Sequence, residues 1–107
     1  MLKQFEDDMV KHVNEHFPDE CANLEKEAVR KKIEYGIKQA ETYAIEIEND
    51  VSRYINLMFL FGTEFDSNAN LSWAAKILRN NELRGSHKMD LLYEEAAKQI
   101  TDPHDTA

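Results

Sequence analysis

The first seventeen residues carry apolar side chains at helical spacing. Apolar residues recur three and four positions apart, with charged residues between them: Leu2, Phe5, Met9, Val13 and Phe17. This spacing places the apolar side chains on one face of a helix. Pro18 lacks a backbone N–H and restricts the residue before it, so it predicts the end of this helix.

A second helix is predicted over residues 19–40. Asp19 stands at the start of this segment, and aspartate is one of the residue types preferred at helix N-caps. Apolar residues follow at helical spacing: Cys21, Leu24, Ala28, Ile33, Ile37 and Ala40. Gly36 interrupts the pattern at a cost of about 1 kcal/mol relative to alanine, so we expect close packing or a bend there. Residues 43–48 alternate between apolar and polar but are few, and they predict a tight connection rather than a strand.

The most apolar segment, residues 50–61, predicts a central helix. Asn49 or Asp50 can cap its start, and Gly62 stands in the position of a left-handed C-terminal cap. After Tyr54, apolar residues cover nearly the whole circumference of this helix. A helix that is apolar on all sides is surrounded by neighbours, so we expect it at the centre of the fold.

Two further helices are predicted after a polar loop at residues 62–70. The fourth helix carries Leu71, Trp73, Ala74, Ile77 and Leu78, and it closes at Asn80 and Asn81. Ser86 can cap a fifth helix with Met89, Leu92, Tyr93, Ala96, Ala97 and Ile100 on its apolar face. The sequence therefore predicts an all-α fold, a compact bundle of about five helices in a single domain over residues 1–100. Residues 101–107 are predicted to form a flexible C-terminal tail.

The composition fits one globular domain with an acidic surface. The chain has 107 residues, 42% of them hydrophobic and 32% charged, and a formal net charge of −8. Thirteen of the acidic residues fall in the first fifty positions, against seven basic ones. Such a surface repels phosphate backbones and anionic lipids, so neither nucleic acid nor a membrane is the expected partner. It suits a basic protein partner, although acidity also serves solubility alone.

The cysteine count and the N-terminal sequence indicate an intracellular setting. Cys21 is the one cysteine, which excludes an internal disulfide framework. The chain starts with an acidic amphipathic pattern that lacks the features of a signal peptide. Its longest apolar run, residues 57–61, is far shorter than the ~20 residues that span a bilayer. We therefore expect a cytoplasmic location.

Two segments have an incomplete resemblance to metal sites. His12 and His16 are four residues apart on one helix face, with Glu15 beside them, as in part of a zinc site. No second Cys/His cluster completes four ligands, and a solvated helix face is the simpler interpretation. The loop that starts at Asp66 copies the first positions of a calcium-binding EF-hand, but Leu71 replaces its essential glycine. Asp66 or Asn70 is expected to satisfy backbone donors of this loop instead. We therefore expect no metal and no cofactor.

Catalytic motifs are also missing from the sequence. It contains no nucleophile elbow, no phosphate-binding glycine loop and no dinucleotide-binding fingerprint. Cys21 follows a predicted helix start, where a thiol can become reactive, but it also fits the apolar stripe and is expected to be inert core. We therefore expect the protein not to be an enzyme.

Aromatic residues around the polar loop are the predicted partner-binding site. Large aromatics are enriched at the energetic centres of protein interfaces. Most aromatic residues here are expected in the core, whereas Phe65 and Trp73 flank the loop and are expected to be partly exposed. Together with Asp66 they form the predicted partner-binding set.

The second half of the chain carries a resemblance to other proteins. Its residues are Tyr43-Ala44-Ile45, Asp50-Val51, Tyr54-Ile55-Asn56-Leu57-Met58-Phe59, Gly62, Phe65-Asp66, Leu71-Ser72-Trp73-Ala74, Ile77-Leu78, Leu83-Arg84 and Leu92-Tyr93. On these positions, residues 35–96 resemble small helical bacterial proteins of unknown function, found near genes for type VI secretion spike and effector proteins. Members often have glycine at the position of Ala44. The resemblance implies an accessory, adaptor or immunity-type protein that binds a secreted effector or spike protein.

The expected function is therefore a non-catalytic protein-binding module. Two alternatives stay open at this point. One is a regulatory helical domain that mimics DNA and binds a basic protein, which the acidity allows. The other is a metal-binding helical protein that uses His12, Glu15 and His16. The oligomeric state is not indicated by the sequence.

Overall fold

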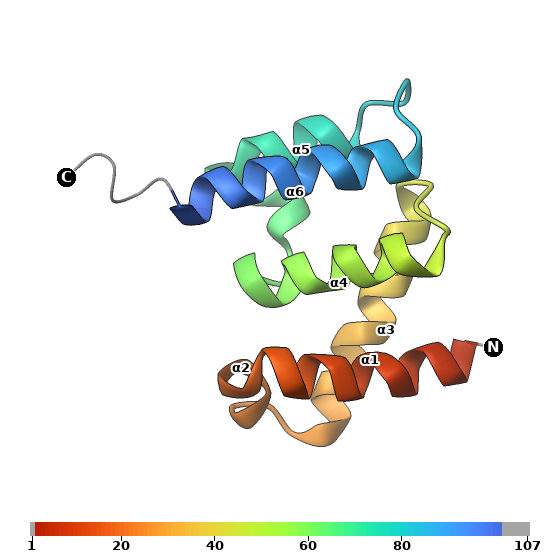
Figure 1. The fold of residues 1–107 in the computed structure, drawn as a ribbon, viewed down its shortest axis with the longest axis vertical. Coiled ribbons are helices and arrows are strands. Elements are labelled where there is room, and N and C mark those ends of the chain that lie inside the picture. The colour runs from red at the N-terminus through yellow and green to blue at the C-terminus, as the bar shows by residue number, and fades with distance from the viewer. Residues whose placement is uncertain (1, 102–107) are drawn as a thin grey trace.

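The computed structural model describes residues 2–101, and within that range the chain is helical, with no strand (Figure 1). The α-helices are α1 (Leu2–His16), α2 (Pro18–Ala22), α3 (Lys26–Thr42), α4 (Glu48–Phe61), α5 (Ser72–Leu78) and α6 (Gly85–Thr101). Two short 3-10 helices, η1 (Phe65–Ser67) and η2 (Ala69–Leu71), connect α4 to α5. The prediction of an all-α bundle is confirmed, with six α-helices in this range rather than about five.

The extra helix arises because the predicted segment 19–40 is divided. Residues 23–25 separate α2 from α3, and Leu24, expected on the apolar stripe, is one of the exposed large hydrophobics. Phe17 rather than Asp19 is the N-cap of α2, and Pro18 is its first residue. Proline suits that position because its missing N–H would have no partner inside the helix.

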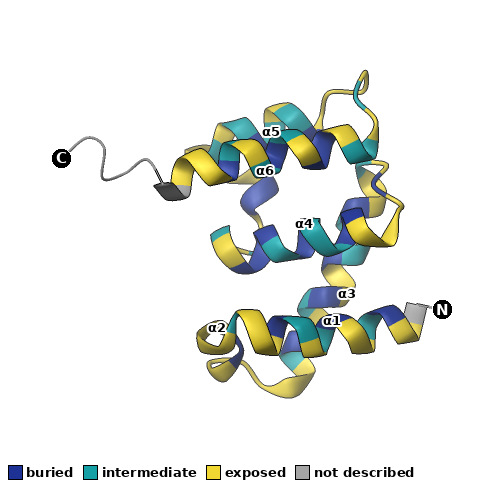
Figure 2. Cartoon of the chain, viewed as in Figure 1, coloured by how far each residue is buried: buried dark blue, intermediate teal, exposed yellow. Residues whose placement is uncertain are grey.

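Helix α4 lies at the centre of the bundle, as predicted. It contacts α1, α3, α6 and η1, and Figure 2 shows it between α1 and the pair formed by α5 and α6. Seven of its residues are buried. Its ends differ from the prediction. Ile47 is the N-cap, and Asp50 lies inside the first turn. Gly62 has a positive φ of 112° but an extended ψ of 152°, which is not the left-handed helical conformation.

Gly36 explains how α3 approaches α4 so closely. A Cβ atom at this position would lie 2.7 Å from Met58 Sδ and 2.9 Å from Ile55 Cγ1. These distances are shorter than real Cβ atoms show, so any larger residue would push these side chains aside where the two helices meet. The expected close packing is confirmed, and α3 continues through Gly36 without a break.

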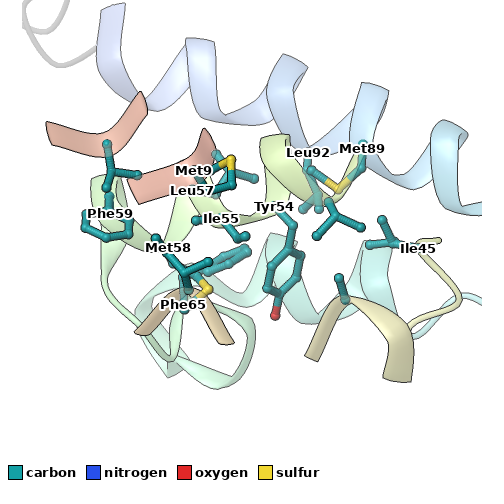
Figure 3. Close-up of a cluster of buried hydrophobic side chains, with 14 of the residues drawn as sticks. Met9, Ile45, Tyr54, Ile55, Leu57, Met58, Phe59, Phe65, Met89 and Leu92 are labelled. Atoms are coloured by element: carbon teal, nitrogen blue, oxygen red, sulfur yellow. The ribbon is translucent and has the colours of Figure 1, made fainter. Parts of the chain in front are cut away.

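One hydrophobic core joins all of these elements (Figure 3). Tyr54 from α4 and Phe65 from η1 are its largest fully buried side chains, with ring centroids 5.1 Å apart. Met9 from α1, Ile45 from the α3–α4 connection and Met89 from α6 extend the same cluster. The first and last helices are therefore held to α4 by burial of apolar surface.

The polar loop predicted at residues 62–70 is more ordered than expected. It contains η1 and most of η2, and it buries Phe65 and Asp66. Asn68, rather than Asp66 or Asn70, satisfies a backbone donor here, because its Oδ1 accepts from the Asn70 N–H at 2.8 Å.

The last helix also differs in detail from the prediction. It starts at Gly85, so Ser86 lies inside it and does not cap it. Thr101, expected in the flexible tail, is the last residue of α6. Residues 102–107 of the predicted tail lie outside the described residues. Over residues 2–101 no helix is both long and apolar enough to cross a membrane.

Candidate functional site

The predicted partner-binding residues occupy different environments. Phe65 has no exposed surface, so the expectation that it is partly exposed is wrong. The reason is that η1 turns this side chain into the core beside Tyr54, although the loop around it is polar. Asp66 is also buried, whereas Trp73 is partly buried, as expected. Only Trp73 of the three therefore presents a large surface side chain.

The Asp66 carboxylate accepts hydrogen bonds from two neutral side chains at the end of α3, Gln39 and Tyr43. Tyr43 donates its hydroxyl proton to Asp66 Oδ2 at 2.7 Å, and Gln39 donates from Nε2 to the same oxygen at 3.1 Å. Burial and this hydrogen bond raise the pKa of Tyr43 to about 12, while Arg79 acts in the opposite direction. Asp66 thus anchors η1 to the end of α3, and its carboxylate faces the interior rather than a partner.

Trp73 packs edge-on against Phe61, with ring centroids 5.7 Å apart. Its indole N–H is buried and has no hydrogen-bond partner in the described part of the chain. Leu60, on the outside of α4, is 49% exposed. A partner-binding role for Trp73 stays a prediction, because the side chain packs on α4 in the way that a core aromatic does.

The two histidines of the first helix lie side by side, and His12 is bonded to α4. Asn56 donates from its amide to the Tyr93 hydroxyl at 3.1 Å, so its oxygen is left to accept from His12 Nε2 at 3.0 Å. His12 Nε2 then carries a proton, and in the neutral ring the lone pair lies on Nδ1. The ring of His16 lies 4.4 Å from that of His12. No group of three or more His, Cys, Asp or Glu side chains in residues 2–101 is placed to hold a metal ion.

Cys21 is buried in the core, as expected, where α2 packs against α1. Burial raises the pKa of its thiol, although the Lys32 ammonium acts in the opposite direction. The thiolate is the nucleophilic form of cysteine, so a raised pKa lowers the reactivity of the residue at neutral pH.

A large recess of the described surface is a groove along α1, α3 and the start of α4. Its volume is about 830 Å³. Apolar side chains from each of these elements and from the α3–α4 connection line it: Phe5, Ile37, Ile45 and Val51. Tyr35, which is 37% exposed, adds an aromatic ring. We call this recess the acidic groove because of the charges that surround it.

Carboxylates dominate the edge of the acidic groove. Five glutamates line it, namely Glu6, Glu34, Glu41, Glu46 and Glu48, against two lysines, Lys31 and Lys38. Of these five glutamates only Glu6 has a cation of residues 2–101 within ion-pair distance, because Arg30 Nη1 lies 3.0 Å from its Oε1. The same guanidinium bonds Asp7 at 2.7 Å and so ties α1 to α3. The remaining four glutamates leave a surplus of negative charge around an apolar floor.

The buried carboxylate of Asp50 fixes the start of α4, which forms one end of the groove. Asp50 precedes Val51 and accepts from Arg53 Nη2 at 2.6 Å and from the Ser86 hydroxyl. Burial alone would raise the pKa of Asp50, but the hydrogen bonds from Ser86 and Arg53 outweigh burial and lower it. Arg53 also bonds Asp90 on α6 at 3.0 Å. The start of α4 is therefore fastened to α6, and this side of the groove is held in place.

The groove was not predicted because its residues come from four separate segments. Its floor residues look like ordinary core positions in the sequence, and its glutamates look like ordinary surface positions. The one sequence signal is the concentration of acidic residues in the first fifty positions, where all five groove glutamates lie. No family model, curated protein or solved structure matches the chain.

Proposed function

We propose that the protein is a binding module that receives a basic amphipathic helix of another protein in the acidic groove. The observation that carries this proposal is the combination of an apolar floor with a glutamate-rich edge. An amphipathic helix that lies in an apolar groove is a common mode of peptide recognition. Its apolar residues would cover the floor, while lysines or arginines on either side would face the glutamates.

The charge of the groove favours this occupant over a second copy of the chain. Two copies that meet at this face would bring two sets of glutamates together, and like charges across an interface are costly. A basic helix instead gains from the same field, which raises its association rate. The arrangement also excludes an acidic peptide, for which the edge would be repulsive.

The proposal keeps the protein-binding function expected from the sequence but places the binding site in the acidic groove instead of at Phe65, Asp66 and Trp73. The resemblance described above implies a stoichiometric binding role, with a secreted effector or spike protein as the partner. Such a partner needs only to present a basic helix. The DNA-mimic alternative rests on acidity alone, whereas the groove adds an apolar floor that a DNA mimic does not need. The proposed module is non-catalytic.

The experiment uses a labelled peptide of about 18 residues, long enough to form several helical turns. Its leucines are spaced at i, i+3, i+4 and i+7, and lysines fill the other positions. Fluorescence anisotropy measures its affinity for the protein, and amide NMR shifts locate its binding. A matched peptide with glutamate in place of lysine serves as the ligand control. We expect the lysine peptide to shift groove residues and the glutamate peptide not to bind.

A pair of charge-reversal variants tests the groove against general acidity. Glu34→Lys with Glu41→Lys changes two groove glutamates on α3, whereas Glu82→Lys with Glu94→Lys makes the same change in net charge at exposed positions elsewhere. We expect the groove pair to weaken binding about tenfold and the control pair to have a much smaller effect. Equal losses in the two variants would show that the peptide responds only to net charge, and the proposal would be wrong.

A second pair of variants tests the apolar contact. Tyr35→Ala removes an exposed ring that lines the groove, and Leu60→Ala removes a comparably exposed side chain that does not. Anchors at interface centres cost about 2 kcal/mol or more when truncated. We expect that loss for Tyr35→Ala and parent-like binding for Leu60→Ala.

A further inference from the structure

A second, smaller recess lies where the end of α3 meets the end of α5 and the start of α6. Its volume is about 350 Å³. Thr42, Tyr43 and Ala44 line it from α3 and the following turn. Arg79 and Asn81 line it from the end of α5, and Lys88 from α6. None of these residues belongs to the acidic groove. We call this recess the basic pocket.

Lys88 is an unusual residue to find in such a place. It is only 3% exposed, although lysine is almost never fully buried without a charged partner. Its Nζ donates to the Tyr43 carbonyl oxygen at 2.8 Å, and it makes no ion pair with any residue in the range 2–101. Burial lowers the pKa of Lys88.

Part of this arrangement has a purely structural explanation. Tyr43 is the C-cap of α3, and lysines near helix C-termini bond the last carbonyls and complement the helix dipole. That contact uses one N–H of the ammonium, which has three. A buried cation whose charge is unbalanced is costly, so the remaining donors and the charge favour an anion in the adjoining recess.

Arg79 supplies a second cation at the mouth of the basic pocket. It is exposed and forms no ion pair within the described part of the chain. Its guanidinium lies close enough to the Tyr43 side chain to oppose the rise in pKa that burial causes there. A guanidinium suits planar oxyanions because it offers several N–H donors in one plane. Thr42 and Asn81 add neutral hydrogen-bonding groups to the lining.

From this geometry we propose that the basic pocket binds a small oxyanion, a phosphate or a carboxylate, between Lys88 and Arg79. Lys88 supplies the buried charge and Arg79 the accessible one. This site stands apart from the acidic groove in both position and ligand. It also runs against the net charge of −8, because most of the surface repels anions.

The test is a titration of the whole chain with inorganic phosphate, followed by amide NMR at constant ionic strength. A parallel titration with acetate separates phosphate from carboxylate recognition, and sodium chloride is the control for ionic strength. We expect saturable shifts at residues 42–44, 79–81 and 88 with phosphate, acetate or both. Absence of saturable shifts at these residues with either anion would overturn the proposal.

Variants separate the pocket from unspecific attraction. Arg79→Gln changes an exposed side chain and is expected to keep the fold, and Arg84→Gln is its control at an exposed position outside the pocket. We expect Arg79→Gln to weaken oxyanion binding about tenfold, the scale of one hydrogen bond to a charged group. Arg84→Gln should bind as the parent does, and an equal loss in both variants would contradict the proposal.

Lys88→Met keeps the length of the side chain and removes its charge, and Lys76→Met is its exposed control. We expect Lys88→Met to abolish the saturable shifts while Lys76→Met retains them. Unchanged binding by folded Lys88→Met would overturn the role of the buried ammonium. If Lys88→Met fails to fold, the Arg79→Gln result decides. Both anions are distinct from the leucine–lysine peptide, so failure here leaves the groove proposal standing and the reverse also holds.

Discussion

The acidic groove and the basic pocket lie on the two sides of one short connection. Ile45 and Glu46 line the groove, whereas Tyr43 and Ala44 line the pocket. The groove is ringed by five glutamates, and the pocket contains Lys88 and Arg79 with no acidic residue in its lining. Neighbouring residues of the chain thus face fields of opposite sign. A net charge of −8 describes the whole surface and says little about any one recess.

The connection between α3 and α4 separates the two recesses because its backbone is tightly fixed. Ala44 has a positive φ of 64°, in the left-handed region that residues other than glycine rarely adopt. The Ala44 N–H donates to the Glu41 carbonyl and the Ile45 N–H to the Ala40 carbonyl, both at 2.9 Å. Gly85, the first residue of α6, packs directly beneath Ala44. The position of this turn determines which side chains face which recess.

The largest expected effect comes from Gly85→Ala. A Cβ atom at Gly85 would lie 2.5 Å from the Ala44 carbonyl oxygen and 3.0 Å from Ile45 Cα. These are backbone atoms, so the whole turn must move. We expect a loss of about 3 kcal/mol in the free energy of unfolding, at the upper end of overpacking costs. Urea unfolding measures this loss, and both recesses should lose affinity for their probes in the same variant.

Gly36→Ala is the matched comparison for that variant. Its Cβ would also be crowded, but by the side chains of Met58 and Ile55 rather than by backbone. The flexible Met58 can shift, and alanine gains about 1 kcal/mol of helix propensity. We expect a net loss of about 1 kcal/mol with both recesses intact. A loss as large as that of Gly85→Ala would mean that the turn is not specially sensitive.

The next effect is a loss of stability at alkaline pH that depends on Tyr43. Its pKa is raised to about 12, mainly by burial and by the bond to Asp66. A raised pKa stabilises the fold fully below about pH 10, where an unfolded tyrosine titrates, and that stabilisation is lost as pH rises toward 12. We expect the unfolding free energy to fall by about 1.4 kcal/mol per pH unit for each such tyrosine.

Denaturant titrations at several pH values measure this slope. Tyr54, whose pKa is also raised by burial, contributes in the same direction. Tyr43→Phe should therefore give a shallower slope between pH 10 and 12 without abolishing it. An unchanged slope in Tyr43→Phe would show that the phenol at the edge of the basic pocket does not hold the turn through Asp66.

Salt should affect the two recesses differently. The groove glutamates lie at the surface, where added ions screen them, whereas Lys88 is buried and is screened less. We expect affinity for the leucine–lysine peptide to fall roughly tenfold between ~0.01 M and ~0.15 M ionic strength, as the Debye length shortens from about 30 Å to about 8 Å. Affinity for phosphate should fall less over the same range. Equal salt dependence would remove the distinction between the recesses.

The smallest expected effect is that of Ala44→Gly. A left-handed conformation is unfavourable for alanine and costs glycine nothing, but glycine loses more entropy on folding. The two terms nearly cancel, so we expect a gain of about 0.5 kcal/mol or less in unfolding free energy. Thermal unfolding measures it. A clear loss of stability would mean that packing of the Ala44 methyl group stabilises the fold by more than its left-handed conformation costs.

The sequence predicted the parts of the fold that depend on local pattern. The apolar stripe of residues 2–17 and the apolar circumference of residues 50–61 identified α1 and the central α4, and Gly36 identified a helix contact. The division between α2 and α3 was missed because Leu24 continues the apolar spacing while lying at the surface. Helical periodicity does not show which apolar residue in a series has a neighbour to pack against.

The candidate sites could not be predicted for a related reason. The sequence predicts partial exposure for Phe65 because it flanks the polar loop, yet η1 directs it into the core. Lys88 was not singled out, because a lysine on an amphipathic helix is normally solvated. Both assignments depend on contacts between segments far apart in the chain, such as the bond from Lys88 to the Tyr43 carbonyl. Such contacts leave no periodic signal.

The buried thiol of Cys21 has a practical consequence for experiments on this molecule. Because it is the one cysteine and its pKa is raised by burial, a thiol-reactive dye has little to modify in the folded state. Labelling then requires the corner formed by α1 and α2 to open, so its rate reports how often that corner opens. The labelling rate of Cys21 thus measures local opening in the unmodified sequence. This rate can be measured in the presence of the leucine–lysine peptide or of phosphate, without an engineered labelling site.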